Sequence, residues 1–250
     1  MVFEALGLFL LEAGAGTALL LLFFPPRAVG RGFLILHGAL AFGFLLAACL
    51  VRPTGLPFPL ACVATGLFGS YVLISLWEPS IAGWPTLASG AALSVWAMAR
   101  VALLAPRGNA WTVSGAMAGS LLFGAVVLTM NLGHWYLVSR SLPRRLLTRG
   151  AVFFAGLVTG RTLLLVLALA ADRSARGREA LFRPEEDALF FLFRIAWGIV
   201  GPVALSYFIW KTAEMKSNQA ATGLLYVALV FVLIGELLSS YLTVSTGFPA

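Results

Sequence analysis

Long apolar segments alternate with short polar ones along nearly the whole chain. Each apolar segment is close to the ~20 residues that a helix needs to cross the hydrocarbon core of a bilayer. Prolines such as Pro25, Pro53 and Pro106 fall between the segments, where a missing backbone donor interrupts no helix. The pattern therefore predicts eight transmembrane helices, at about residues 3–24, 32–51, 57–77, 85–105, 111–139, 150–171, 188–210 and 221–244.

The composition agrees with this pattern. Hydrophobic residues make up 60% of the 250 residues and charged residues only 11%, whereas a water-soluble domain carries about 25% charged residues. The sequence thus predicts an all-α, polytopic membrane protein, with residues 1–250 in a single domain that is a bundle of eight transmembrane helices. The net charge of +7 comes from basic residues near the ends of the spans, where they meet lipid headgroups, so no nucleic-acid partner is expected.

An even number of spans places both termini on the same side of the membrane. We call the opposite side, which holds the loops after the first, third, fifth and seventh spans, the odd-loop side. Basic residues occur on both sides, but the basic segment 140–149 favours a cytoplasmic odd-loop side and external termini. We therefore expect a multi-pass protein of the cell (plasma or inner) membrane.

Four charged residues lie deep inside the predicted spans: Glu12, Arg161, Arg194 and Glu236. A charge at the centre of a bilayer costs about 2.5–3.5 kcal/mol even on insertion scales, so each one needs a partner or a purpose. One interpretation is two buried ion pairs, Glu12 with Arg161 and Arg194 with Glu236. The other is a proton path, and the two interpretations are compatible.

The two histidines of the chain, His37 and His134, are predicted about five residues from the odd-loop end of two antiparallel spans. Their matched depth suits two hydrogen bonds to a quinone headgroup, or two axial ligands to the iron of a haem b. Two unrelated histidines are the remaining alternative. Asn131, Tyr136 and Tyr226 lie at a similar depth and complete the candidate quinone site. No other metal site is expected.

Two segments, FLLEAGAGT from Phe9 to Thr17 and VLIGELLSSYL from Val232 to Leu242, lie in the first and last spans. They resemble the corresponding spans of the polysulfide-reductase and dimethyl-sulfoxide-reductase type of membrane anchor. The resemblance implies a haem-free or haem-poor subunit that exchanges electrons between membrane quinone and an iron–sulfur partner. One departure is that an Arg commonly follows the Gly-Glu element in that family, where this chain has Ser239.

Taken together, these patterns predict an integral membrane subunit of an electron-transfer complex. It would bind quinone or quinol from the quinone pool of the bilayer and pass electrons to or from an iron–sulfur or cytochrome partner subunit. The chain lacks a Walker loop, a zinc signature and a nucleophile elbow, so it would be a non-catalytic or quinone-reactive subunit of an oxidoreductase complex. Two alternatives remain: a haem b cytochrome with His37 and His134 as axial ligands, and a transporter or structural anchor.

Overall fold

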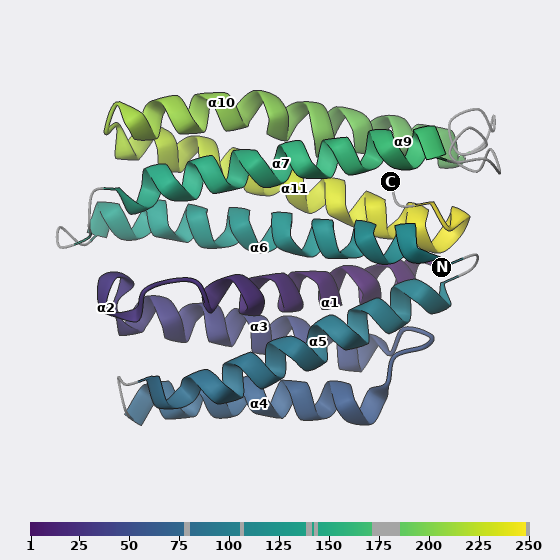
Figure 1. Cartoon of the computed structure of the whole chain (residues 1–250), viewed down its shortest axis with the longest axis horizontal. Coiled ribbons are helices and arrows are strands. Elements are labelled where there is room, and N and C mark those ends of the chain that lie inside the picture. Colours follow the sequence, from purple (N-terminus) through teal and green to yellow (C-terminus); the bar gives the residue numbers. More distant parts are fainter. Residues whose placement is uncertain (78–80, 106–107, 139–141, 143–144, 172–185, 249–250) are drawn as a thin grey trace.

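The computed structural model describes residues 1–77, 81–105, 108–138, 142, 145–171 and 186–248, which form helices and no strands (Figure 1). The first half of the chain forms α1 (Val2–Leu21), the short α2 (Pro26–Val29), α3 (Arg31–Val51), α4 (Phe58–Trp77), the 3-10 turn η1 (Ile81–Gly83) and α5 (Trp84–Leu104). The second half forms α6 (Ala110–Val138), α7 (Leu146–Ala171), α9 (Glu186–Ile195), the π-helical turn η2 (Ala196–Val200), α10 (Gly201–Glu214) and α11 (Asn218–Thr246).

Eight described helical segments are long and apolar enough to cross a membrane, with α9, η2 and α10 joined into one of them. This confirms the predicted all-α bundle of eight spans, and the chain is a multi-pass membrane protein. The predicted bounds differ mainly at the ends: α7 begins at Leu146 and α11 at Asn218. Helices extend beyond their apolar segments here because long or polar side chains can reach the headgroup region while the backbone stays hydrogen-bonded.

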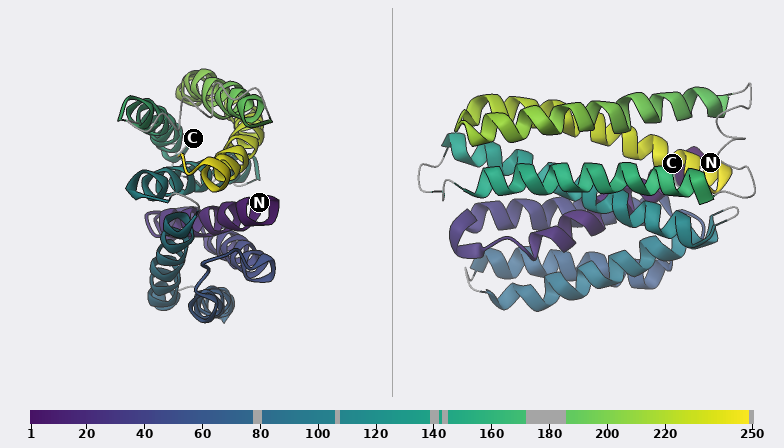
Figure 2. Two further views of the ribbon diagram at one scale, coloured as in Figure 1. Left: turned by 90° about the vertical axis from the view of Figure 1, so that its right-hand side faces the viewer. Right: turned by 45° about the horizontal axis from the view of Figure 1, so that its top comes forward.

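The spans fall into two groups that follow the order of the chain. The end-on view shows α1, α3, α4 and α5 on one side of the bundle and α6, α7, α10 and α11 on the other (Figure 2). The termini lie at one end of the bundle, as an even number of spans requires (Figure 1). Helices α1 and α6 meet where the groups join. In the apolar part of each helix, 78% of the residues of α1 and 72% of those of α6 are buried, against at most 44% in the other spans.

We call the boundary between the two groups of spans the seam, and small residues form the contact between α1 and α6 at its centre. A Cβ atom added at Gly124 would lie 2.5 Å from the backbone carbonyl carbon of Gly16, and one added at Gly16 would overlap the backbone of Ser120. Close approach of two helix backbones is the usual result of small residues facing each other in a membrane. The glycines of the first span therefore have a packing role.

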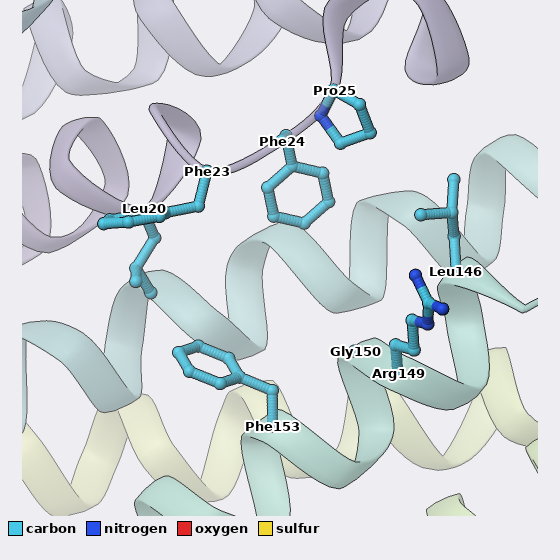
Figure 3. A pocket seen from close by; sticks show the side chains of 8 residues that line it. All are labelled: Leu20, Phe23, Phe24, Pro25, Leu146, Arg149, Gly150 and Phe153. Carbon is cyan, nitrogen blue, oxygen red and sulfur yellow. The ribbon is translucent and has the colours of Figure 1, made fainter.

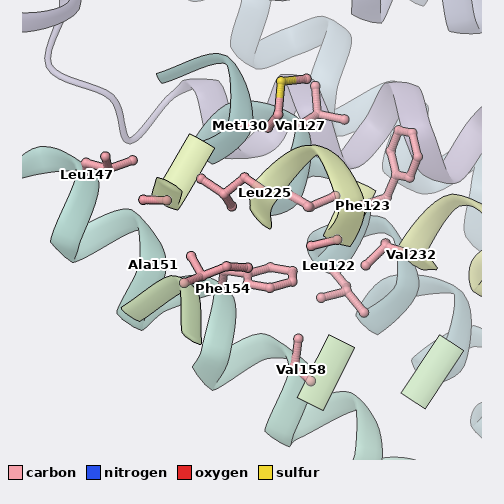
Figure 4. Packing of buried hydrophobic residues seen from close by; sticks show 14 of the residues in the cluster. Leu122, Phe123, Val127, Met130, Leu147, Ala151, Phe154, Val158, Leu225 and Val232 are labelled. Carbon is pink, nitrogen blue, oxygen red and sulfur yellow. The ribbon is translucent and has the colours of Figure 1, made fainter. Parts of the chain in front are cut away.

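Apolar side chains fill the space on both sides of the seam. One buried cluster joins α6, α7 and α11 through residues such as Phe123, Phe154 and Leu225 (Figure 4). A second joins α6 to the first group through Phe33, Leu45 and other side chains. The polar contacts described below are therefore surrounded by hydrocarbon.

The seventh span contains a local irregularity next to one of its charges. Pro202 has no N–H, and the π-helical turn Ala196–Val200 ends two residues before it in the chain. Such turns are rare, occur often at functional sites, and help to satisfy the backbone around a proline inside a membrane. This turn follows Arg194 in the chain and faces α11.

Candidate functional site

The structure brings the four charged residues of the spans together near mid-depth. Glu12, Arg161, Arg194 and Glu236 each lie eight to ten residues from the terminal-side end of their helix, or about 12–15 Å along the axis. Their side chains are 0–3% exposed. We call these four residues the central cluster. It draws one charge from each of α1, α7, α9 and α11.

Glu236 is the acceptor for both arginines. Arg194 donates from Nη2 to Glu236 Oε1 at 3.0 Å, and Arg161 donates from Nη2 to Oε2 at 3.3 Å. Arg161 also donates to the hydroxyl of Ser239 at 2.6 Å. Both carboxylate oxygens of Glu236 are therefore held by guanidinium groups, which is the arrangement that a buried carboxylate requires.

This pairing differs in part from the two separate ion pairs expected from the sequence. Arg194 and Glu236 form the expected contact, but Arg161 lies on Glu236 instead of forming a separate pair with Glu12. The reason is that α11 packs against α9 and η2, while the long side chain of Arg161 reaches the same carboxylate from α7.

Glu12 occupies a different position in the central cluster. Among the described residues, no basic group lies within 4.0 Å of its carboxylate. The hydroxyl of Ser240 lies 3.2 Å from Glu12 Oε2 and 3.0 Å from the backbone carbonyl oxygen of Glu236. A hydroxyl can donate to an ionised Glu12, or accept from a protonated Glu12 while it donates to the carbonyl. The contact therefore suits both protonation states of Glu12.

Glycines make room for these side chains. A Cβ at Gly119 of α6 would overlap the Glu236 carboxylate and would lie 3.4 Å from Glu12 Oε2. A Cβ at Gly198 of η2 would overlap the Arg194 guanidinium and would lie 2.8 Å from the Cα of Gly235. These glycines are needed because helix backbones and charged groups approach more closely here than any side chain allows.

The charges of the central cluster balance when all four groups are ionised. Because Glu236 is shared by two guanidinium groups, Glu12 is the group at which a proton can be added without breaking an ion pair. The cluster can therefore hold a net charge of zero or of +1. Arg194 can also donate further hydrogen bonds, since its Nε and Nη1 have no hydrogen-bond acceptor among the described residues.

Nearer the odd-loop side, His37 and Asn131 form a second polar contact across the seam. His37 is fully buried, with Nδ1 2.7 Å from the carbonyl oxygen of Phe33 and Nε2 3.0 Å from Asn131 Nδ2. A neutral imidazole that donates from Nδ1 and accepts at Nε2 satisfies both contacts. The contact joins α3 to α6.

The other predicted site residues lie elsewhere. His134 is exposed, and its Nδ1 lies 3.4 Å from the hydroxyl of Tyr226, which is also exposed. Tyr136 is half-buried and packs against the hydrophobic clusters on both sides of the seam. The five residues of the expected quinone site are thus divided among three places, because equal depth does not make two side chains face the same way.

The contacts of His37 bear directly on the haem b alternative. Both ring nitrogens of His37 lie within hydrogen-bond distance of protein atoms, so neither is left to coordinate a haem iron, and the pair does not fit axial ligation. The described residues include no group of three or more His, Cys, Asp or Glu side chains that could hold a metal ion. The imidazole of His134 and the phenol of Tyr226, by contrast, lie exposed on the surface of α6 and α11.

The structure also shows a groove that the sequence patterns did not indicate. It has a volume of about 550 Å³ and lies between the end of α1 and the start of α7 (Figure 3). Its lining is formed by Leu20, Phe23, Phe24, Pro25, Leu146, Arg149, Gly150 and Phe153. The only sequence signal for it is a pair of aromatic residues at the end of one span and an arginine at the start of another.

Comparison with known protein families, with curated proteins and with solved structures finds no match for this chain.

Proposed function

We propose that the chain is the membrane subunit of an electron-transfer complex and exchanges protons at Glu12 when quinone is reduced or quinol is oxidised. The observation that supports this most directly is the position of Glu12. It is a carboxyl group buried near mid-depth, held by the Ser240 hydroxyl, beside three charges that are paired with one another. Ionisable groups inside a membrane commonly belong to proton relays.

A quinone, when bound, supplies two-electron chemistry that takes up two protons on reduction and releases two on oxidation. A protein that handles quinone therefore needs groups that give and take protons. In this proposal, His134 and Tyr226 bind the headgroup from the surface of α6 and α11, and His37 with Asn131 holds the seam beside them.

A proton route must connect the headgroup site at His134 and Tyr226 with Glu12, which lies at a different depth in the membrane. Tyr226 and Glu236 are ten residues apart on α11, which corresponds to about 15 Å. Thr17 lies five residues from Glu12 toward the odd-loop side, and it is fully buried with no hydrogen-bond partner for its hydroxyl among the described residues. A buried hydroxyl without a partner is uncommon and needs an explanation. A step in a proton route supplies one.

The electrons come from a partner subunit in this proposal. The chain has two cysteines, whereas an iron–sulfur cluster is usually held by four protein ligands. The partner is an iron–sulfur or cytochrome subunit. The bundle lies in the cell membrane, with its odd-loop side in the cytoplasm and its termini outside.

The test is the variant Glu12→Gln in the intact complex, purified through a tag on this chain from its own host. Glutamine keeps the size of the side chain and can still hydrogen-bond Ser240, but it cannot take up a proton. We expect quinol-linked electron transfer to fall by roughly 10²-fold, the lower end of what a positioned proton-transfer group contributes. Subunit composition should not change.

The matched control is Glu4→Gln on the same helix. Glu4 contacts the backbone N–H and the hydroxyl of Thr54 at the exposed terminal-side end, at 2.6 and 2.7 Å, and its loss should leave the rate within about twofold, as expected for a group outside the relay. A normal rate for Glu12→Gln would contradict the proposal. Loss of partner subunits with no change in rate per intact complex would identify the chain as a structural anchor.

A further inference from the structure

The groove between α1 and α7 has apolar walls and one cationic side chain. Leu20, Phe23 and Phe24 form one wall of the groove. Phe153 belongs to the other wall, and Arg149 of the same helix also lines the groove (Figure 3). Arg149 is exposed, and among the described residues no carboxylate lies within 4.0 Å of it. An apolar cavity with a single, open guanidinium group is complementary to an amphiphile with an anionic head.

The polar and apolar parts of the groove are ordered by depth. Because α7 begins at Leu146, Arg149 lies in its first turn and Phe153 one turn deeper, about 6 Å further from the membrane surface. The guanidinium group is thus at the level of lipid headgroups, and the ring of Phe153 is at the level of the first part of the acyl chains. A phospholipid has this same order of parts along its length.

The charge around the groove has the sign that an anionic headgroup requires. Arg145 precedes Arg149 by four residues and so lies on the same side of the helix start. By sequence position, eight basic and two acidic residues belong to the odd-loop side, against seven and six on the terminal side. The odd-loop residues are Arg27, Arg31, Arg140, Arg144, Arg145, Arg149, Lys211 and Lys216, with Glu78 and Glu214.

We propose that this groove binds one anionic phospholipid, with its phosphate on Arg149 and an acyl chain along Phe23, Phe24 and Phe153. A quinone has a neutral headgroup and would leave the charge of Arg149 unbalanced. Basic pockets between transmembrane helices commonly hold anionic headgroups. The site is independent of the proposed function, because it uses no residue of the central cluster and neither His134 nor Tyr226.

The experiment uses the full chain, purified in detergent and stripped of lipid. Phosphatidylglycerol or phosphatidylcholine is then added, and bound lipid is counted by native mass spectrometry. We expect one phosphatidylglycerol to be retained in preference to phosphatidylcholine. Arg149→Gln should weaken phosphatidylglycerol binding by about five- to tenfold, as the loss of a charge near the surface predicts. Arg149→Lys should keep most of it.

Three controls separate this site from general attraction to basic surfaces. Arg100→Gln removes an exposed charge at the opposite end of the bundle, beside Trp96, and should leave lipid binding unchanged. Phe153→Ala should weaken both lipids to a similar degree, because it removes contact with the chain and not with the head. A wild-type protein at high salt should lose the preference for phosphatidylglycerol, which tests the charge without any substitution.

Three results would overturn the proposal. One is equal retention of the two lipids by the wild-type chain. Another is phosphatidylglycerol binding that Arg149→Gln leaves unchanged. The third is a quinone that copurifies with the wild-type chain and is lost from Arg149→Gln, while phosphatidylglycerol is retained equally by both, which would assign the groove to a quinone instead.

Discussion

In the part of the chain that the structure describes, two polar contacts cross the seam between the first four spans and the last four, and they are built differently. In the central cluster, Glu12 reaches Ser240 beside three charges that hold one another. Nearer the odd-loop side, His37 meets Asn131 through a single hydrogen bond between neutral groups. The first contact collects charged side chains from four helices, whereas the second needs two helices only.

The difference follows from the cost of burying each kind of group. Removing one partner from a buried ion pair costs about 3–5 kcal/mol, since an uncompensated charge remains. A neutral donor or acceptor left without a partner costs about 1–3 kcal/mol. A charge in hydrocarbon therefore demands several ligands from several helices. A neutral polar group can be satisfied by one neighbour, or left at the surface as His134 is.

The largest effect should come from Glu236→Gln, which leaves two guanidinium groups without their shared carboxylate. We expect the free energy of unfolding to fall by about 3–5 kcal/mol, measured by denaturation of the purified chain in mixed micelles. Glu214→Gln is the control, because Glu214 pairs with Lys211 on the surface, where both are about half exposed. It should cost less than about 1 kcal/mol. Equal losses for the two variants would show that the central cluster does not stabilise the bundle.

A smaller loss in the free energy of unfolding is expected from Gly198→Ala, which tests whether close packing positions the arginines. The added methyl group would overlap the Arg194 guanidinium and crowd Gly235. Overpacking of this kind costs about 1–3 kcal/mol, and the same unfolding measurement applies. Gly223→Ala on α11 has no atom within 4 Å of the added Cβ, so it should be neutral or slightly stabilising. If Gly198→Ala behaves like this control, the η2–α11 contact is looser than described.

The neutral contact is tested by a double-mutant cycle on His37 and Asn131. Each alanine variant should lower the free energy of unfolding by about 1–3 kcal/mol, and the double variant should cost less than the sum. His134→Ala, which removes an exposed ring, should cost less than about 0.5 kcal/mol. Strict additivity of the His37 and Asn131 variants would mean that the two side chains do not share a hydrogen bond.

The last measurement is a dithionite-reduced minus oxidised absorbance spectrum of the purified chain, in which we expect no haem signal. Because both nitrogens of His37 are engaged, no b-type haem band should appear. A band near one haem per chain that disappears in both His37→Ala and His134→Ala would overturn the neutral description of this contact.

Part of the candidate site could be predicted from the sequence. The eight spans and the position of the four charges deep inside them follow from the length of apolar segments and from residue number. The partners could not be predicted in the same way. Arg161 lies on Glu236 together with Arg194, Glu12 lies on Ser240, and His37 and His134 face different neighbours. The groove beside Arg149 had no clear signal either.

The physical reason is that the depth of a residue in the membrane depends on its own helix, whereas the neighbour that its side chain meets depends on the helices packed around it. Each residue advances a helix by about 1.5 Å, so position along the chain gives depth within the membrane. Which neighbour a side chain meets depends on how each helix is rotated and which helices pack beside it. That is decided by contacts such as Gly16 with Gly124 and Gly198 with Gly235, between residues far apart in the chain. The sequence by itself determined the spans and the levels of the charges, and the tertiary structure decided which of those charges share a partner.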